Sequence, residues 1–193
     1  MIHNNYFEIL NQFLGDYNRE IYGRELIGKV SLSQKGIALA LESLEKDGVL
    51  TSKKRGNMKF FSLNTKYARI KDTIVMAEIA QKTHFFEKHQ TIANLFKSDE
   101  RIVGIFGSYA KNTQKKDSDI DIFIIGEKIG DDYVKKAKVY DLDVSIKYFT
   151  IKEFKGLLQK KNPLITEIIA NHILIFNVEQ FIELAWRDYY GFD

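Results

Sequence analysis

The residues best suited to chemistry in this sequence are three aspartates that lie at or within apolar runs near its middle. Asp119 and Asp121 open one such run, and Asp143 lies in another. Carboxylates that are held close together repel one another, and a divalent cation is the usual counter-charge. Ligands that offer only oxygen favour Mg²⁺, which binds one or two carboxylates together with substrate phosphates. The pattern therefore predicts a magnesium site that handles phosphate.

The segments around these aspartates predict how they are positioned. We expect strands over residues 102–106, 118–125 and 139–148, and a short helix over residues 109–114. Two positions apart on a strand, Asp119 and Asp121 point to one face. Because ten residues separate Ser108 from Asp119, too few for a parallel crossover, the first two strands are expected to be antiparallel.

Gly107 and Ser108 stand where the first strand ends, beside the predicted start of the second. Glycine lets a phosphate approach the backbone closely, and Ser108 adds a hydroxyl at the start of a helix, where free amides attract anions. Carboxylates, a metal and an anion cradle together predict phosphoryl or nucleotidyl transfer.

The order Gly107-Ser108-Tyr109-Ala110-Lys111, then Ser118-Asp119-Ile120-Asp121, then an aspartate between apolar residues resembles the polymerase-β-like nucleotidyltransferases, especially their minimal members. The resemblance covers about residues 85–180. It implies that Asp119, Asp121 and Asp143 hold two Mg²⁺ ions and are catalytic, with Asp143 helping to deprotonate the acceptor. It also implies that Gly107, Ser108 and Lys111 bind the nucleoside triphosphate.

Two features depart from the family pattern. Lys111-Asn112 stands where these proteins usually have Arg-Gly, which keeps a cation but alters the helix end. Asp141 is an alternative to Asp143 as the third carboxylate, and we prefer Asp143 because apolar residues flank it on both sides.

The first third of the chain has a different character. Residues 1–66 hold ten basic and seven acidic residues, so they carry the whole net charge of +3. Apolar spacing predicts helices over residues 5–14 and 24–30 and a third that starts at the N-cap Ser33 and stops at Gly48. Extended runs over residues 49–52 and 59–63 flank a basic segment and predict a β-hairpin.

Three helices and a basic hairpin resemble the winged helix-turn-helix of small repressors, on the residues from Leu41 to Leu50 and from Arg55 to Asn64. In such domains the third helix enters the major groove and the wing contacts phosphate or the minor groove. The resemblance implies these DNA-binding residues: Ser33, Gln34, Lys35, Lys53, Lys54 and Arg55. A winged helix that makes only protein contacts is the alternative.

The sequence therefore predicts an α+β chain. It consists of a winged helix-turn-helix domain (residues 1–66), one or two connecting helices (67–98) and a nucleotidyltransferase domain (99–193) with a small mixed sheet flanked by helices. The connecting segment, which has no Pro or Gly, is the candidate surface for a homodimer. The absence of Cys excludes disulfides and thiol catalysis, and no apolar run is long enough to span a membrane, so a cytoplasmic location is expected.

We expect an enzyme that transfers a nucleoside monophosphate, AMP from ATP, to a hydroxyl of an unidentified acceptor and releases pyrophosphate. One alternative is a DNA-binding regulator whose second domain senses nucleotide without turnover. Another is an antitoxin that nucleotidylates a toxin partner.

Overall fold

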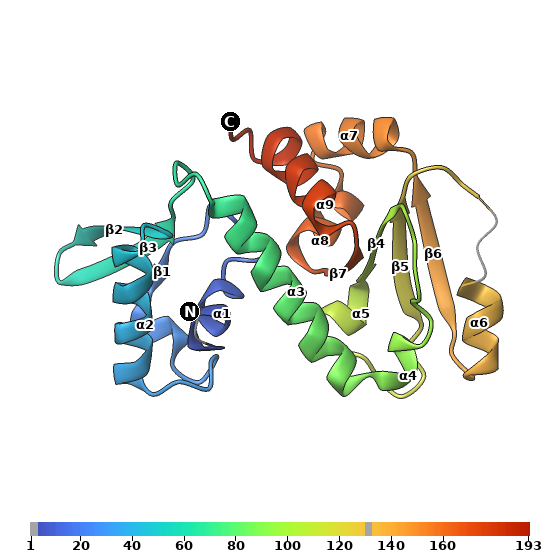
Figure 1. Ribbon diagram of the computed structural model, residues 1–193, viewed down its shortest axis with the longest axis horizontal. Helices are drawn as coiled ribbons and strands as arrows, with labels where there is room; N and C mark the ends of the chain where they lie inside the picture. Colours follow the sequence, from blue (N-terminus) through green and yellow to red (C-terminus); the bar gives the residue numbers. More distant parts are fainter. Residues whose placement is uncertain (1–3, 130–132) are drawn as a thin grey trace. The chain divides into compact units, whose positions relative to one another are not determined.

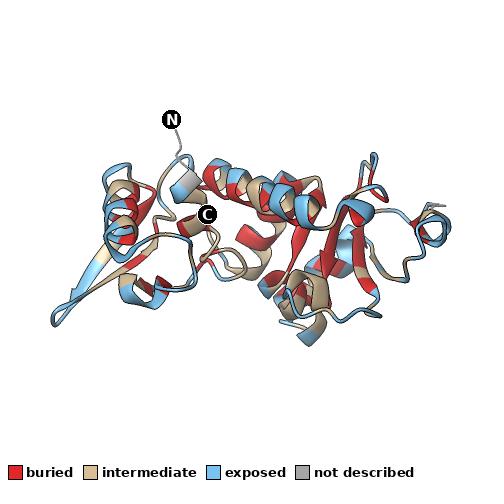
Figure 2. Ribbon diagram, turned by 90° about the horizontal axis from the view of Figure 1, so that it is seen from below, coloured by how far each residue is buried: buried red, intermediate tan, exposed pale blue. Residues whose placement is uncertain are grey.

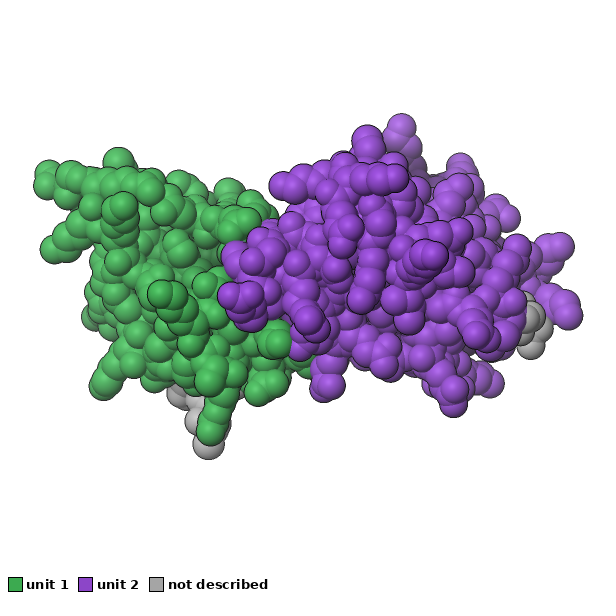
Figure 3. Space-filling model, turned by 90° about the horizontal axis from the view of Figure 1, so that it is seen from above, with its two compact units in different colours: residues 1–77 green, residues 78–193 purple. Residues whose placement is uncertain are grey.

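The computed structural model describes residues 4–129 and 133–193, and the chain divides into two compact units, Met1–Ala77 and Glu78–Asp193 (Figures 1 and 3). Helix α3 (Ile70–Lys88) runs from the first unit into the second. The first unit contains a three-stranded antiparallel sheet and the second a four-stranded mixed sheet, so the predicted α+β class is confirmed at this level. No helix among the described residues is both long and apolar enough to cross a membrane.

The first unit alternates short helices and strands before the start of α3. Its sheet has the order β1-β3-β2, and both pairings are antiparallel. The elements are α1 (Asn4–Leu10), β1 (Ile21–Tyr22), the 3₁₀ helix η1 (Gly23–Leu26), α2 (Gln34–Lys46), β2 (Leu50–Arg55) and β3 (Met58–Leu63).

Helix α2 begins and ends where the sequence predicts. The Ser33 side chain accepts a hydrogen bond from the Gly36 amide at 3.2 Å and so satisfies one of the free donors of the first turn. The helix stops before Gly48, whose φ of +79° lies in the left-handed region that favours glycine. The apolar stripe of the helix is buried: Ile37, Leu41 and Leu44.

The other two predicted helices of this unit are shorter than expected. Helix α1 ends at Leu10 rather than near residue 14, and turns follow it, although Phe13 is still buried. The helix predicted over residues 24–30 is wrong: only η1 forms, and Ile27 is 51% exposed. Gly28, at φ +80°, leaves the right-handed helical region and explains why no helix continues to residue 30.

The predicted hairpin is present, but its strands are longer than expected. Strands β2 and β3 pair without interruption: Leu50 lies opposite Leu63 at one end of the hairpin, and Arg55 lies opposite Met58 at the other. Gly56 and Asn57 alone connect them, and Gly56 adopts the positive φ that tight hairpin turns require. The basic residues predicted at the hairpin tip therefore lie within β2 instead.

The second unit is built on the mixed sheet. The strand order is β6-β5-β4-β7; β4 is antiparallel to β5 and β7, and β6 is parallel to β5. After α3, its elements are α4 (Gln90–Ala93), β4 (Ile102–Phe106), α5 (Gly107–Ala110), β5 (Ile120–Ile125), α6 (Tyr133–Val139), β6 (Val144–Phe149), α7 (Ile151–Gln159), α8 (Pro163–Ala170), β7 (Ile173–Phe176), α9 (Val178–Leu184) and the π-helix η2 (Ala185–Tyr189).

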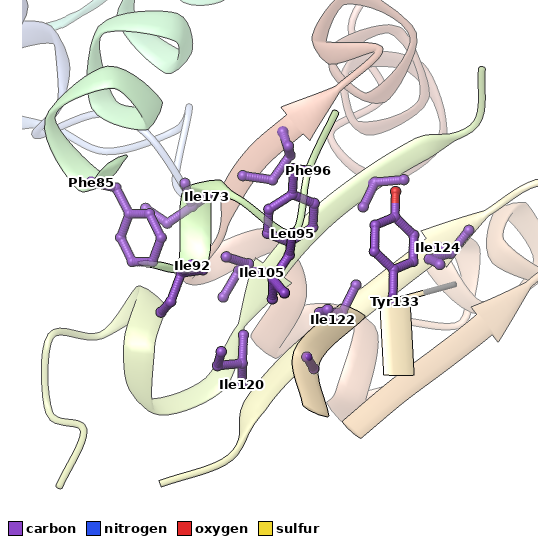
Figure 4. Close-up of a cluster of buried hydrophobic side chains, with 13 residues drawn as sticks. Phe85, Ile92, Leu95, Phe96, Ile105, Ile120, Ile122, Ile124, Tyr133 and Ile173 are labelled. Atoms are coloured by element: carbon purple, nitrogen blue, oxygen red, sulfur yellow. The ribbon is translucent and has the colours of Figure 1, made fainter. Parts of the chain in front are cut away.

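Both faces of the central strands are buried, as the burial colours of Figure 2 show. On one face of β5, Ile120, Ile122 and Ile124 belong to a cluster with residues of α3, α4 and α6 (Figure 4). On the other face, Phe123 packs against Phe181 of α9, with ring centroids 5.7 Å apart. A strand covered on both faces reads as a continuous apolar run, which is why β5 is visible in the sequence.

Helices α7 and α8 also begin at local sequence signals. Thr150 and Glu153 form a reciprocal capping box at the start of α7, and Pro163 occupies the first turn of α8. These signals are local, so they do not depend on what the helices pack against.

Candidate active site at the start of strands β5 and β6

The first part of the candidate site is the turn between β4 and α5. Antiparallel pairing of β4 with β5 confirms the predicted orientation and sets Phe106 opposite Asp121. Gly107 follows with a φ of +70°, and a Cβ atom there would lie only 2.3 Å from Oδ2 of Asp121. Two features therefore require glycine at position 107: the backbone conformation and the close approach of the Asp121 carboxylate.

Helix α5 starts two residues earlier than expected and forms a single turn. The sequence predicts a helix over residues 109–114, whereas α5 ends at Ala110, so Ser108 lies inside the helix. The Lys111 amide donates to the Gly107 carbonyl at 3.1 Å and closes the turn. Asn112 then takes a φ of +54°. Asn tolerates this region better than most residues, so it suits a position where the family usually has Gly.

The register of the sheet brings the three predicted aspartates to adjoining strand ends. Ile120 of β5 pairs with Val144 of the parallel strand β6, and the Ile120 amide donates to the Asp143 carbonyl at 2.9 Å. Asp119 and Asp143 thus each stand directly before one of the two paired strands. Asp121 pairs with Ser145, one step further along.

The beginning of the third strand was predicted wrongly, and the difference bears on Asp141. Residues 133–139 form helix α6, and β6 begins only at Val144, not at residue 139. Asp141 has a φ of +52° in the turn between them, while Asp143 lies directly before the strand. The backbone therefore brings Asp143, and not Asp141, next to Asp119.

The electrostatic setting of Asp121 is that of a partly buried carboxylate among like charges. Burial raises the pKa of Asp121, and the neighbouring carboxylates of Asp119 and Glu167 raise it further. The ammonium groups of Lys147 and Lys111 act in the opposite direction and do not offset the increase. A cation held here would stabilise the charged form of Asp121.

The carboxylates share an edge of the sheet, but their side chains do not converge on one point. Within residues 4–129 and 133–193, no three or more His, Cys, Asp or Glu side chains group tightly enough to hold a metal ion. The donors at this edge are all oxygen atoms, which fits Mg²⁺ rather than a softer metal. The magnesium site with its predicted ligands Asp119, Asp121 and Asp143 stays a prediction.

Two charged residues near Asp121 were not identified from the sequence. Lys147 lies two residues after Ser145 on β6, so strand alternation could have placed it on the same face. Glu167 of α8 forms an ion pair with Lys111, with Oε1 2.6 Å from Nζ. No local spacing could indicate this contact, because the two residues are 56 positions apart.

The predicted DNA-binding residues lie in the first unit. Gln34 and Lys35 are exposed in the first turn of α2, after the N-cap Ser33. Lys53 and Lys54 are exposed on β2.

Arg55 is exposed too, but it is already engaged. It forms an ion pair with Glu20 at 2.7 Å and lies over the Phe60 ring, 5.1 Å from its centroid. We therefore expect Arg55 to contribute less to binding of an anionic partner than its neighbours on β2.

The chain matches a protein-family model over the region that contains the site. Residues 90–181 match the family model described as Polymerase beta, Nucleotidyltransferase. Residues 90–181 form a polymerase beta-like nucleotidyltransferase domain. The domain includes every strand of the mixed sheet and all three predicted aspartates, and its family implies a transferase that uses divalent metal. No curated protein and no solved structure matches the chain.

Proposed function

We propose that this protein transfers a nucleoside monophosphate, AMP from ATP, to a hydroxyl group and releases pyrophosphate. One observation carries the proposal: within a polymerase beta-like domain, Asp119, Asp121 and Asp143 stand at adjoining strand ends beside the Gly107 turn. In the reaction the acceptor oxygen attacks the α-phosphorus. The bond from that phosphorus to the bridging oxygen breaks, and pyrophosphate leaves with the bond electrons.

The residues of the site have different roles in this reaction. Gly107 and Ser108 let the backbone approach the triphosphate, and the Lys111 ammonium offsets phosphate charge. Asp143 accepts the proton of the acceptor hydroxyl.

The carboxylates of Asp119, Asp121 and Asp143 would hold Mg²⁺, which stabilises negative charge on the phosphoryl oxygens when bound. The carboxylates at this end of the sheet support the assignment, since the partial burial of Asp121 and its repulsion by Asp119 call for a counter-charge.

The test measures pyrophosphate release from ATP and Mg²⁺, with acceptors first sought by labelling a native lysate with ATP that carries the label at the α-phosphate. We expect Asp119→Asn and Asp121→Asn to reduce release by a factor of roughly 100 or more. Asp117→Asn is the matched control, because Asp117 is exposed in the turn just before the site. Pyrophosphate release that survives both site substitutions refutes the proposal.

A second function is favoured by the first unit. We propose that it is a winged helix-turn-helix that binds DNA, because α2 is followed by a long hairpin on which Lys53 and Lys54 are exposed. The exposed side of α2 bears Glu42 as well as Lys35, so the hairpin is expected to supply most of the attraction to phosphate. This proposal predicts salt-dependent DNA binding. Binding that Lys53→Ala/Lys54→Ala leaves unchanged would favour a role in protein contacts instead.

A further inference from the structure

An ion pair between Lys111 and Glu167 lies at the edge of the candidate site. Its two side chains are 39% and 38% exposed, so the pair is open to solvent and to a ligand. Both charges also act on Asp121, which places them in the electrostatic field of the predicted catalytic carboxylates.

The two partners differ in how firmly they are held. Glu167 lies on α8, whose N-terminus is fixed by Pro163 and by the Asn162 side chain, which accepts from the Leu164 amide at 3.0 Å. Three isoleucines anchor this helix in the core: Ile165, Ile168 and Ile169. Lys111, in contrast, follows a single helical turn and carries a flexible four-carbon side chain.

A lysine that is paired with a carboxylate still has hydrogen-bond donors for a second ligand. An ammonium group has three N–H donors, and the bond to Glu167 uses one of them. Two donors remain for phosphate oxygens, and the contact with Glu167 restricts the otherwise flexible lysine side chain before the ligand arrives.

We propose that Glu167 is a positioning residue that holds the Lys111 ammonium ready for the triphosphate. The inference rests on the proposed nucleotide-binding role of Lys111 and adds a partner that the sequence motif does not contain. Because the ammonium contacts phosphate and not the base, the effect of Glu167 is expected to be the same for ATP, GTP and inorganic tripolyphosphate.

The experiment measures equilibrium binding of MgATP and of tripolyphosphate by calorimetry, together with KM and kcat for pyrophosphate release. Glu167→Gln keeps an acceptor oxygen but removes the charge, and we expect roughly threefold weaker binding of both ligands, while Glu167→Ala weakens binding by about fivefold. KM rises by the same factors and kcat is unchanged.

Two further variants separate positioning from other effects. In the Lys111→Met background, Glu167→Gln is expected to have no additional effect, because its partner is gone. Glu45→Gln is the matched control, because it breaks a similar ion pair in the first unit. The side chains of that pair, Lys59 and Glu45, are 36% and 31% exposed. We expect this substitution to leave nucleotide affinity unchanged.

The outcomes are distinct. Unchanged or tighter binding in Glu167→Gln, or an equal loss in the Lys111→Met background, overturns the positioning role. Lack of ATP binding by the unmodified protein overturns it as well. ATP binding that depends on Glu167 without any pyrophosphate release supports the positioning role and refutes only the proposed catalytic function.

Discussion

Replacing Gly107 by Ala tests whether the close approach between the β4–α5 turn and Asp121 matters. The new Cβ would lie 2.3 Å from Oδ2, 3.1 Å from Cγ and 3.3 Å from Cβ of Asp121, so the carboxylate must move. The φ of +70° adds a backbone cost of about 1–2 kcal/mol for any residue with a Cβ. Overpacking adds about 1–3 kcal/mol if Asp121 cannot shift freely.

Gly191 provides a matched control for the backbone part of this cost. Its φ of +69° is nearly the same, but a Cβ there meets nothing within 4 Å. Gly191→Ala is therefore expected to lose only the backbone cost, about 1–2 kcal/mol, and to keep full activity.

The assay combines urea unfolding with pyrophosphate release. We expect Gly107→Ala to lose about 2–5 kcal/mol of unfolding free energy. Since Asp121 must move by an ångström or more, we also expect a rate loss of roughly 100-fold. A Gly107→Ala protein that matches Gly191→Ala in both measurements would show that Asp121 does not need this approach.

Three further predictions concern other parts of the chain. Burial lowers the pKa of His172, but the Glu78 carboxylate at 3.0 Å and the hydrogen bond to the Ile168 carbonyl outweigh it and raise the net pKa. The pair therefore contributes its full stabilisation below the pKa of His172 in the unfolded protein, about 6.5. This stabilisation is lost as the pH rises from there through the pKa of His172 in the folded protein, by up to about 1.4 kcal/mol per pH unit. Urea unfolding between pH 6 and 9 checks this, and a decline of the same size in Glu78→Gln contradicts it. Lys53→Ala/Lys54→Ala is expected to reduce the slope of log DNA affinity against log salt by about 2, whereas the exposed Lys97→Ala of the second unit leaves it unchanged. Ser33→Ala is expected to lower the unfolding free energy by about 1 kcal/mol, and Ser33→Asp, which restores an N-cap acceptor, to recover most of it.

Features that depend on neighbouring residues were predictable from the sequence. The N-cap Ser33, the helix stop at Gly48 and the apolar run of β5 all follow from local chemistry. The antiparallel pairing of β4 and β5 also followed, because the connecting segment is too short for a parallel crossover.

Element boundaries were less predictable because apolar spacing does not show where the backbone turns. The helix expected over residues 24–30 and the strand expected from residue 139 both failed at residues with positive φ, Gly28 and Asp141. Glycine adopts both positive and negative φ, so its presence does not predict which one occurs. An aspartate adopts a positive φ only occasionally, so the sequence does not indicate the turn at Asp141.

The order of residue types along the chain predicts the side chains that could perform the chemistry, since Gly107-Ser108, Asp119, Asp121 and Asp143 form a recognisable series. Which of them stand at adjoining strand ends, and what surrounds them, became visible only in the folded protein. Strand register brought Asp143 rather than Asp141 to Asp119, and helix packing set Glu167 against Lys111. These contacts join residues far apart in the chain, so their geometry depends on how the sheet and its helices pack together and not on local propensity.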